Sequence, residues 1–389
     1  MQKVAYLIAG DLSCYTRNAD QYQFIKMLID HFNGLIVVPK GYTEWIPIDF
    51  RQKERYEEFH CPAWIFRGIN RRLFAWMIYS FGIFKTRKAI KVFCIEPSSE
   101  ITFLGVYFAS LIFRIQYVLF CWDPPGVSIR DRADWLSRFR CWVMDILFTV
   151  TAKRSKGVIL NLHPEFCERR FSETVRKKFY PFPNGTRVVE NQNLMVPPKD
   201  RIEKRIAVNS ALSIEKGCWD IAHFFVRLWI HDPKVSLVWI GSGRERDSIL
   251  NYFKSEGVPM DVVDVTGQLP HAEALKKLST GSLAVIVYRD LPSLRWNYVL
   301  KAPEFLSLGC PIVSVRLPGV STYIEEGKTG VLFTPGDWNE AFEKTVALLD
   351  SPERIVQMRG KCLEVAKQFD WGTINQQIAE RIQILFSSK

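Results

Sequence analysis

Short apolar runs alternate with helical patterns along nearly the whole chain. In the first half, runs of β-branched and aromatic residues bounded by polar, glycine or proline residues predict buried strands. These runs cover residues 4–9, 35–38, 92–95, 117–121 and 158–160, and a helical pattern over residues 20–32 separates the first two. The order strand, helix, strand predicts crossover units and a parallel sheet covered on both faces.

A second series of the same kind follows a break at residues 181–205, which are rich in proline, asparagine and charge. Such a composition is typical of a domain boundary. Beyond it, the predicted strands are residues 205–209, 236–240, 262–266, 284–287 and 311–315, with the clearest helices at 218–231 and 338–349. We therefore expect an α/β chain of two doubly wound, Rossmann-like domains, with ligands bound in a cleft at the carboxyl ends of their strands.

Composition narrows the class of protein. Of 389 residues, 48% are hydrophobic and 24% are charged, which is typical of a globular chain and not of a disordered one. No apolar run reaches the roughly 20 residues of a membrane span, and the N-terminal run MQKVAYLIAG is too short for a signal peptide. The nine cysteines are scattered singly without a CxxC pair, which favours reduced thiols in the cytoplasm over disulfides or a zinc site.

The positive charge is concentrated in one half of the chain. Residues 1–190 contain 28 Lys and Arg against 18 Asp and Glu, a net charge of +10, whereas residues 191–389 contain 24 against 23. No zinc-finger spacing, RNP-type signature or basic zipper accompanies this excess, so we expect no nucleic acid as partner. Residues 71–76 (RRLFAW) and 135–142 (WLSRFRCW) mix arginine with aromatic residues, which suits an anionic membrane surface. The alternative is a set of core helices with solvated basic ends.

Glycine and lysine residues follow predicted strands in the second half. Gly241 and Gly243 stand between the strand at 236–240 and a helical pattern, where backbone amides could approach a phosphate. An ordinary tight turn explains them equally well, because the third glycine of a dinucleotide fingerprint is absent. Lys216, in the loop after the strand at 205–209, could contact a diphosphate or be a solvated loop residue.

Residues 298–313 contain the most informative pattern. Lys301 and Glu304 stand three residues apart, on the same side of a predicted helix that ends near Gly309 and Pro311. A nucleotide diphosphate would suit this arrangement, with Lys301 and helix amides at the phosphates and Glu304 at the ribose hydroxyls. An ordinary ion pair on a surface helix is the alternative.

Residues 205–389 resemble the nucleotide-sugar-binding domain of GT-B glycosyltransferases, and most closely the retaining family 4. Several blocks agree in order and spacing, and their combination is more specific than any one of them. They are residues 212–217 (LSIEKG), 240–245 (IGSGRE), 265–271 (VTGQLPH), 301–313, 318–330 and the FDW at 369–371. The resemblance implies a GT-B architecture: an acceptor- and membrane-facing domain at 1–190, a linker at 191–204, a donor domain at 205–369, and a C-terminal helix at 370–389 that crosses back to the first domain.

When the family's functional residues are carried over to the matching positions, the resemblance implies that Lys216 and Lys301 hold the donor diphosphate and that Glu304 holds the ribose. Two positions depart from the family. Ala211 occupies the place of an arginine, and Trp296 occupies the place of the first glutamate of a pair. Arg295 stands next to Trp296 and could supply the lost cation. These departures leave the identity of the donor sugar open.

The first half resembles the family more weakly. Asp123 follows a predicted strand where relatives place a catalytic-loop residue, so we predict its carboxylate near the acceptor or the developing sugar cation. The alternative is an Asp held by its own turn before Pro124. Gly10 follows the first strand where relatives have a glycine-rich loop near the donor, but one glycine is a weak match.

These features together predict a retaining, metal-independent glycosyltransferase with a GDP- or UDP-linked sugar as donor. The predicted acceptor is lipid-linked, such as a polyprenyl-diphosphate saccharide or a lipopolysaccharide core intermediate. It would be glycosylated by a peripheral protein on the cytoplasmic side of a membrane. No metal is expected, because no DxD-type acidic pair or histidine cluster occurs in the predicted cleft segments. The alternatives are an inactive nucleotide-sugar-binding subunit and a sugar-nucleotide epimerase.

Overall fold

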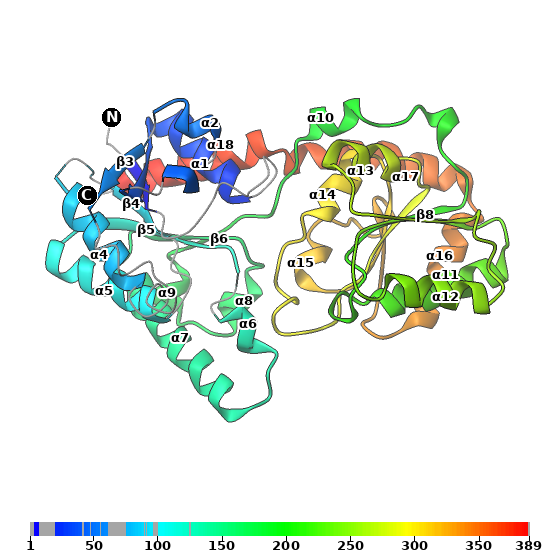
Figure 1. The fold of residues 1–389 in the computed structure, drawn as a ribbon, viewed down its shortest axis with the longest axis horizontal. Helices are drawn as coiled ribbons and strands as arrows, with labels where there is room; N and C mark the ends of the chain where they lie inside the picture. The colour runs from blue at the N-terminus through cyan, green and yellow to red at the C-terminus, as the bar shows by residue number, and fades with distance from the viewer. Residues whose placement is uncertain are drawn as a thin grey trace. The chain divides into compact units, whose positions relative to one another are not determined.

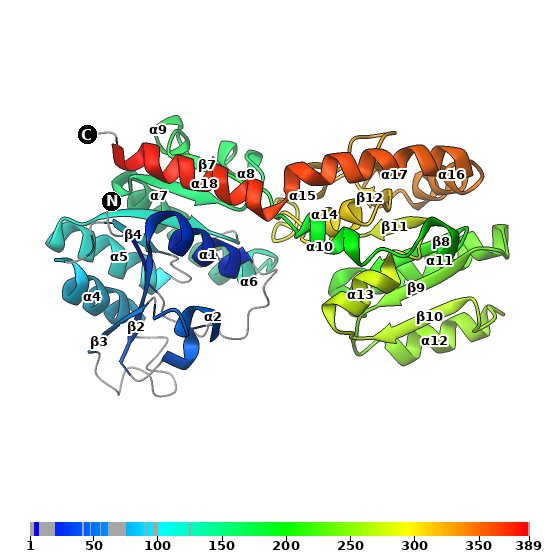
Figure 2. The same ribbon diagram turned by 90° about the horizontal axis from the view of Figure 1, so that it is seen from above.

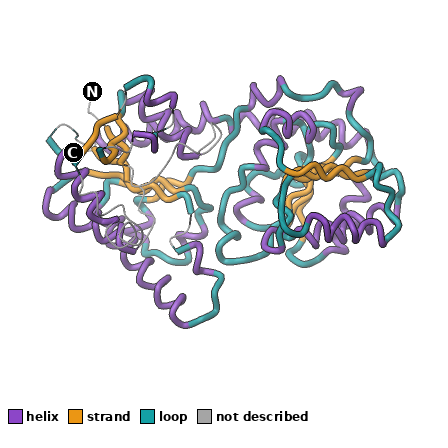
Figure 3. Tube along the Cα trace, in the orientation of Figure 1, coloured by secondary structure: helices purple, strands orange, loops and turns teal. Residues whose placement is uncertain are grey.

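The computed structural model of the chain describes residues 4–7, 20–40, 43–46, 48–54, 56–60, 75–88, 90, 92–95, 100–123 and 126–387. The chain divides into two compact units (Figure 1). One consists of residues 1–183 and 374–389, and the other consists of residues 184–373. Both are built from parallel strands and helices, as the tube in Figure 3 shows by colour.

The first unit contains a parallel sheet in the order β3-β2-β1-β4-β5-β6-β7. The order turns back at β1, which pairs with both β2 and β4, so the sheet is doubly wound. The strands are β1 (Val4–Leu7), β2 (Leu35–Pro39), β3 (Tyr56–Phe59), β4 (Val92–Ile95), β5 (Gln116–Cys121), β6 (Gly157–Leu160) and β7 (Phe179–Pro181). Phe93, Tyr117 and Ile159 are among its buried apolar side chains, as expected for a sheet covered on both faces.

Helices cover both faces of this sheet (Figures 1 and 2). Helices α1 and α18 lie on one face, while α4, α5 and α7 form a layer on the other. The main helices of the unit are α1 (Asp20–Phe32), α4 (Ala75–Thr86), α5 (Glu100–Phe113), α7 (Trp135–Arg154) and α18 (Trp371–Ser387). Single turns are α2 (Ile48–Arg51), α6 (Val127–Arg130), α8 (Glu165–Glu168) and α9 (Glu173–Arg176), with a 3-10 turn at Thr43–Trp45.

The second unit has a parallel sheet in the order β10-β9-β8-β11-β12-β13. Its strands are β8 (Arg205–Asn209), β9 (Ser236–Ile240), β10 (Val263–Gly267), β11 (Leu283–Ile286), β12 (Ile312–Val315) and β13 (Gly330–Phe333). Helices α11, α12 and α16 cover one face, and α13, α14 and α17 cover the other (Figure 1). The helices are α10 (Val188–Asn193), α11 (Cys218–His231), α12 (Arg246–Ser255), α13 (His271–Leu278), α14 (Lys301–Ser307), α15 (Pro318–Ser321), α16 (Trp338–Leu349) and α17 (Pro352–Ala366), with 3-10 turns at Pro198–Asp200, Ile214–Lys216 and Lys367–Phe369.

The boundary between the units lies earlier than the predicted linker at 191–204. The second unit begins at Asn184, whose side-chain amide donates to the Tyr298 carbonyl at 3.0 Å. Asn191, at the start of the predicted linker, is buried in α10 and donates to the Ser307 hydroxyl at 2.9 Å. Asn184 and Asn191 therefore anchor this segment to α14 and to the loop before it. The amino-acid composition of the segment alone is typical of a linker.

The last helix, α18, starts in one unit and ends in the other. Just before it, the Asp370 carboxylate accepts from the Val188 backbone amide at 3.1 Å, within the second unit. From residue 374 onward the helix belongs to the first unit, where Arg381 lies over the ring of Tyr180 at 3.4 Å. In the described part of the chain, no helix is both long enough and apolar enough to cross a bilayer.

Candidate functional site

The second sheet changes its winding direction between β8 and β11. At such a point the loops after the two strands run to opposite faces, and ligands of doubly wound folds bind beside their carboxyl ends. Lys216 ends the 3-10 turn in the loop after β8, Tyr288 lies in the loop after β11, and Lys301 begins the helix that follows that loop. The fold therefore positions both predicted lysines at the expected edge of the sheet.

The two lysines meet at one aromatic ring. The Lys216 ammonium lies 5.6 Å from the centroid of the Tyr288 ring, and the Lys301 ammonium lies 5.7 Å from it. Both distances are within the range of cation–π interaction. Burial raises the pKa of Tyr288 to about 12, so its ring stays neutral between the two cations. No salt bridge to either lysine occurs among the described residues.

Lys301 is held where its charge is disfavoured. Burial, followed by repulsion from Lys216, lowers its pKa to about 8, and the nearby Glu304 carboxylate only partly opposes this. An anion beside Lys301 would raise this pKa again, because an opposite charge stabilises the ammonium. Two neighbouring cations that form no salt bridge with a carboxylate of the described residues make a site that is electrostatically suited to a diphosphate.

Glu304 is placed by a partner that the sequence analysis did not identify. Its Oε1 lies 2.8 Å from Nε2 of His271, the first residue of α13. The hydrogen bond to Glu304 raises the pKa of His271, against the opposing effect of burial. The Glu304 side chain is only 13% exposed, whereas that of His271 is 48% exposed. The pair therefore orients a nearly buried carboxylate one helical turn after Lys301.

Gly241 and Gly243 have a packing role in this structure. A Cβ on Gly241 would lie 2.0 Å from the Ser210 carbonyl oxygen, and one on Gly243 would lie 2.0 Å from that of Leu212. The backbone of Ser242 accepts a hydrogen bond from the Leu212 amide at 3.1 Å. Only glycine permits this approach. The turn after β9 thus supports the loop that carries Lys216, and this accounts for both glycines without a phosphate.

The structure shows the burial and the partners of the residues at and beside the positions that depart from the family. Trp296 is buried, with 6% of its surface exposed, so it is part of the protein interior. Arg295 forms a two-point ion pair with Asp290, through Nε at 2.7 Å and through a terminal nitrogen. The charge of Arg295 is therefore already balanced by a neighbouring carboxylate. Ala211 is exposed and brings no cation to the site.

The two site residues predicted in the first half of the chain do not belong to the unit that contains Lys216 and Lys301. Asp123 belongs to the first unit, where its side chain is exposed and its carbonyl accepts from the Cys121 thiol at 3.0 Å. Gly10 lies outside the described residues. The role of each stays a prediction.

Sequence reasoning missed Tyr288 and His271 as members of the site. Tyr288 follows β11 almost directly, and this position at a strand end was the available signal. His271 was noted only as part of a family block. Its contact with Glu304 joins residues 33 positions apart, which no local pattern reports.

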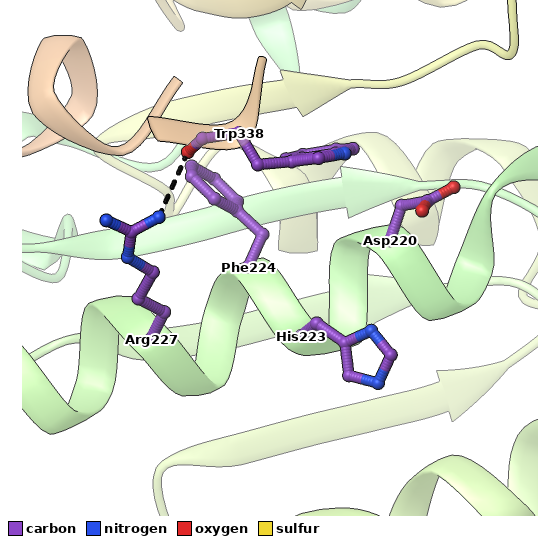
Figure 4. Close-up of a pocket in the computed structure, with 5 residues that line it drawn as sticks. All are labelled: Asp220, His223, Phe224, Arg227 and Trp338. Carbon is purple, nitrogen blue, oxygen red and sulfur yellow. Dashed lines mark hydrogen bonds between the residues drawn. The ribbon is translucent and has the colours of Figure 1, made fainter. Parts of the chain in front are cut away.

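A separate cavity of about 260 Å³ lies beside α11. Figure 4 shows that Asp220, His223, Phe224 and Arg227 come from this helix and that the Trp338 indole lies beside the Phe224 ring. Arg227 already donates to the Asn339 side-chain oxygen at 2.7 Å. None of the predicted donor residues lines this cavity.

Comparison with known proteins agrees with this geometry. Residues 203–351, which contain both lysines and Glu304, match the family model described as glycosyl transferases group 1. We call this matched region the group 1 domain; it lies within the second unit and spans β8 to α16.

Curated relatives are similar over part of the chain. The sulfoquinovosyl transferase SQD2 of Arabidopsis thaliana is 28% identical over 170 residues, which are 43% of this chain and 29% of that protein. A D-inositol 3-phosphate glycosyltransferase of Thermobispora bispora is 26% identical over 140 residues, or 36% of this chain and 32% of that protein. The matched region therefore spans less than a third of the length of either relative.

Solved structures resemble the whole chain, and their likeness defines the fold around the group 1 domain. HepE of Anabaena, crystallised with UDP, has a TM-score of 0.70 at 16% identity and covers 98% of this chain and 100% of its own. The sucrose-phosphate synthase of Thermosynechococcus elongatus has a TM-score of 0.73 at 16% identity and covers both chains fully. The predicted GT-B fold is confirmed.

The packing role of the glycine turn makes a testable prediction for the group 1 domain. Replacing Gly243 by Ala should destabilise the protein by about 1–3 kcal/mol, because the added methyl group collides with the Leu212 carbonyl. Gly360→Ala is the matched control, because nothing lies within 4 Å of a Cβ at this helical position. Alanine should there be neutral or slightly stabilising. Urea unfolding of both variants measures the difference, and equal stabilities would contradict the packing role.

The His271–Glu304 pair predicts a pH dependence. A histidine whose pKa is raised on folding contributes stability that is present below its unfolded pKa, near 6.5, and is lost as the pH rises through the raised value. His271→Gln should therefore lower the free energy of unfolding by up to about 1 kcal/mol at pH 6 and by less at pH 8.5.

Urea unfolding at the two pH values measures this loss. NMR titration of the wild type and of Glu304→Gln gives an independent readout, with the pKa of His271 falling in the variant. His223→Gln is the control, because His223 packs against the rings of Trp219 and Tyr252. A pKa of His271 that does not change in Glu304→Gln would show that the pair does not form.

Proposed function

We propose that the chain is a glycosyltransferase that transfers a sugar from a nucleotide diphosphate. The observation that carries this proposal is the pair of ammonium groups of Lys216 and Lys301 at the Tyr288 ring, within a group 1 domain. Neither lysine has a salt bridge among the described residues, so both charges are available to a diphosphate. The proposed donor is linked to UDP or GDP. The binding of UDP by HepE makes UDP the first candidate.

The proposed chemistry follows from where charge develops. Departure of the sugar leaves negative charge on the terminal phosphate of the nucleotide. Preorganised cations at that point stabilise the transition state, and such electrostatic stabilisation is usually the largest catalytic contribution. Lys216 and Lys301 would supply it, so the proposed reaction needs no metal ion. Glu304, oriented by His271, would accept hydrogen bonds from the ribose hydroxyls.

The proposed reaction retains the configuration of the sugar, as in the family that the chain resembles. Asp123 is the candidate carboxylate near the acceptor or the developing sugar cation. Neither the configuration nor the acceptor follows from the lysine pair. A transfer assay with anomeric analysis of the product by NMR would test the configuration.

We propose an anionic, lipid-linked acceptor, used by a peripheral protein on the cytoplasmic face of a membrane in the synthesis of a surface glycan. The net charge of +10 on residues 1–190 supports an anionic partner for this half. The name of one relative specifies D-inositol 3-phosphate, which is itself an anionic acceptor. A lipid diphosphate presents the same kind of charge.

A second candidate function rests on a specific observation. Ala211 brings no cation, Trp296 is buried where the family has a glutamate, and Arg295 is paired with Asp290. A site with these changes could bind a nucleotide sugar without transferring the sugar, as an inactive partner subunit would. Donor binding with neither hydrolysis nor transfer would support this alternative.

Nucleotide binding tests the site directly. A thermal-shift panel of UDP, GDP, ADP and dTDP should show stabilisation of the wild type by one of them. A ligand at 100 times its dissociation constant contributes about 2.7 kcal/mol of stability. Lys301→Ala and Glu304→Ala, each compared with its own ligand-free midpoint, should lose most of this shift.

Lys361→Ala is the control for charge, since Lys361 pairs with Glu364 on α17. This variant should keep the full nucleotide shift. No shift with any nucleotide would contradict donor binding. An equal shift in Lys301→Ala would instead show that the nucleotide binds elsewhere.

The lowered pKa of Lys301 predicts how binding depends on pH. The pKa is about 8, and an anion binds best when the lysine is charged. The dissociation constant should therefore rise above pH 8, by up to about tenfold per pH unit. Calorimetry between pH 7 and pH 9 measures this rise.

Lys301→Arg is the matched variant, because a guanidinium stays charged over this range. Its dissociation constant should change much less with pH, whatever its value at pH 7. The same pH dependence in wild type and Lys301→Arg would show that another group titrates.

A further inference from the structure

Helix α7 is apolar on two opposite sides. Its inward side includes the buried residues Met144, Phe148 and Thr151. A second series, offset by two residues from the first, faces outward. It consists of Trp135, Phe139, Trp142 and Ile146, with 76%, 51%, 59% and 41% of their surfaces exposed. An offset of two residues turns a side chain about 200° around a helix, so the second series lies opposite the core.

Helix α5 packs against α7 and has exposed apolar residues of its own. It packs beside α7, with the ring centroids of Phe103 and Phe148 5.7 Å apart and the Arg154 Nε donating to the Ser110 hydroxyl at 3.1 Å. Both helices belong to the layer below the sheet of the first unit in Figure 1. The exposed apolar residues of α5 are Leu104, Phe108, Leu111 and Ile112, at 38%, 53%, 40% and 69%.

The first turns of α7 project beyond the rest of this layer, as Figures 1 and 3 show. We call the eight outward apolar residues of α5 and α7 the α5–α7 face. Single exposed apolar residues are common on protein surfaces, but several on two packed helices of one layer indicate an interaction site. Two exposed tryptophans strengthen this argument, because tryptophan concentrates at lipid–water interfaces and in protein contacts.

The charges around the face distinguish its partners. Arg138 and Arg140 stand between the aromatic residues of α7, and Lys153 and Arg154 stand at its end. The one acidic residue of α7, Asp145, is already paired with Arg130 at 2.7 Å and with Arg170 at 3.2 Å. An apolar face with a cationic border fits an anionic lipid surface, where rings enter the interface and cations meet phosphates. A second copy of this chain would bring the same positive charges against it.

We propose that the α5–α7 face docks the first unit onto an anionic lipid bilayer. The aromatic side chains of Trp135, Phe139 and Trp142 enter the interface, while Arg138 and Arg140 contact lipid phosphates. The inference deepens the proposed function and rests on it for its meaning, because docking would bring the chain to a lipid-linked acceptor. The contact itself depends on the first unit alone and can be measured without a nucleotide.

Flotation of the full chain with vesicles tests the docking surface. The vesicles contain phosphatidylcholine either alone or mixed with phosphatidylglycerol, at 50 mM and at 500 mM salt. The wild type should float with the anionic vesicles at low salt and much less with the neutral ones or at high salt. Trp135→Ala/Trp142→Ala and, separately, Arg138→Ala/Arg140→Ala should each reduce partitioning by at least about tenfold, equivalent to 1.4 kcal/mol.

Ile230→Ala/Val356→Ala is the matched control, because these residues are 63% and 62% exposed but lie on α11 and α17 of the second unit. The control should float like the wild type. A wild type that does not bind anionic vesicles would overturn the proposal, and so would Trp135→Ala/Trp142→Ala that floats unchanged. A concentration-dependent dimer abolished by that variant would also overturn it, since the face would then hold a second copy.

The nucleotide thermal shift separates this inference from the proposed function. The α7 variants should keep the wild-type shift, which also shows that they are folded. If flotation depends on the α5–α7 face while no nucleotide binds, the docking surface stands and the proposed activity fails. If nucleotides bind while flotation fails, the activity stands and the docking surface does not.

Discussion

The repulsion between two lysines is the interaction on which the candidate site depends. Lys216 and Lys301 are held against one tyrosine ring, and the second is buried deeply enough that its pKa falls to about 8. Holding two cations together in a poorly solvated place disfavours the free protein. An anion between them offsets that repulsion, so part of the binding free energy comes from the arrangement itself. The rest of the second unit maintains this arrangement.

Backbone packing supports the loops that hold Lys216 and Lys301 in this arrangement. The loop that carries Lys216 is pressed against the turn after β9, and this contact requires a residue without a side chain at Gly241 and at Gly243. A similar contact occurs at Gly319, where a Cβ would lie 2.1 Å from the Asn297 carbonyl oxygen, just before the helix of Lys301. Both loops thus rest on neighbouring backbone at the same edge of the sheet. These contacts support the backbone from which Lys216 and Lys301 extend to the Tyr288 ring.

The sequence predicted local features of the structure, such as strand bounds. It did not predict contacts between segments that are distant along the chain. The bounds of β8 and β9 were predicted correctly, because β-branched runs between polar residues are a strong local signal. The strands β3, β7 and β13 were missed: YEEF contains two charged residues, and FYP is only three residues long. Lys216, Lys301 and Glu304 were predicted from their positions after strands and at a helix start, together with the family blocks that contain them. The Glu304–His271 and Arg295–Asp290 pairs were not found, because side-chain partners are determined by packing. The glycine turn fitted a phosphate loop and a tight turn equally well, and only the structure reveals how close the backbones approach.

The two halves of the chain use positive charge in different ways. The second half is almost neutral overall, with a net charge of +1, yet it holds at one point two lysines that form no salt bridge among the described residues. Such a site acts over a few ångströms and is little affected by salt, because its charges are partly buried. The first half carries +10 and exposes its arginines beside aromatic rings on α7. Exposed charges of this kind act over about a Debye length and weaken as salt is added. Net charge alone therefore indicates the half for which we propose an anionic surface as partner, whereas the half for which we propose a single bound anion is recognised only by where its cations lie.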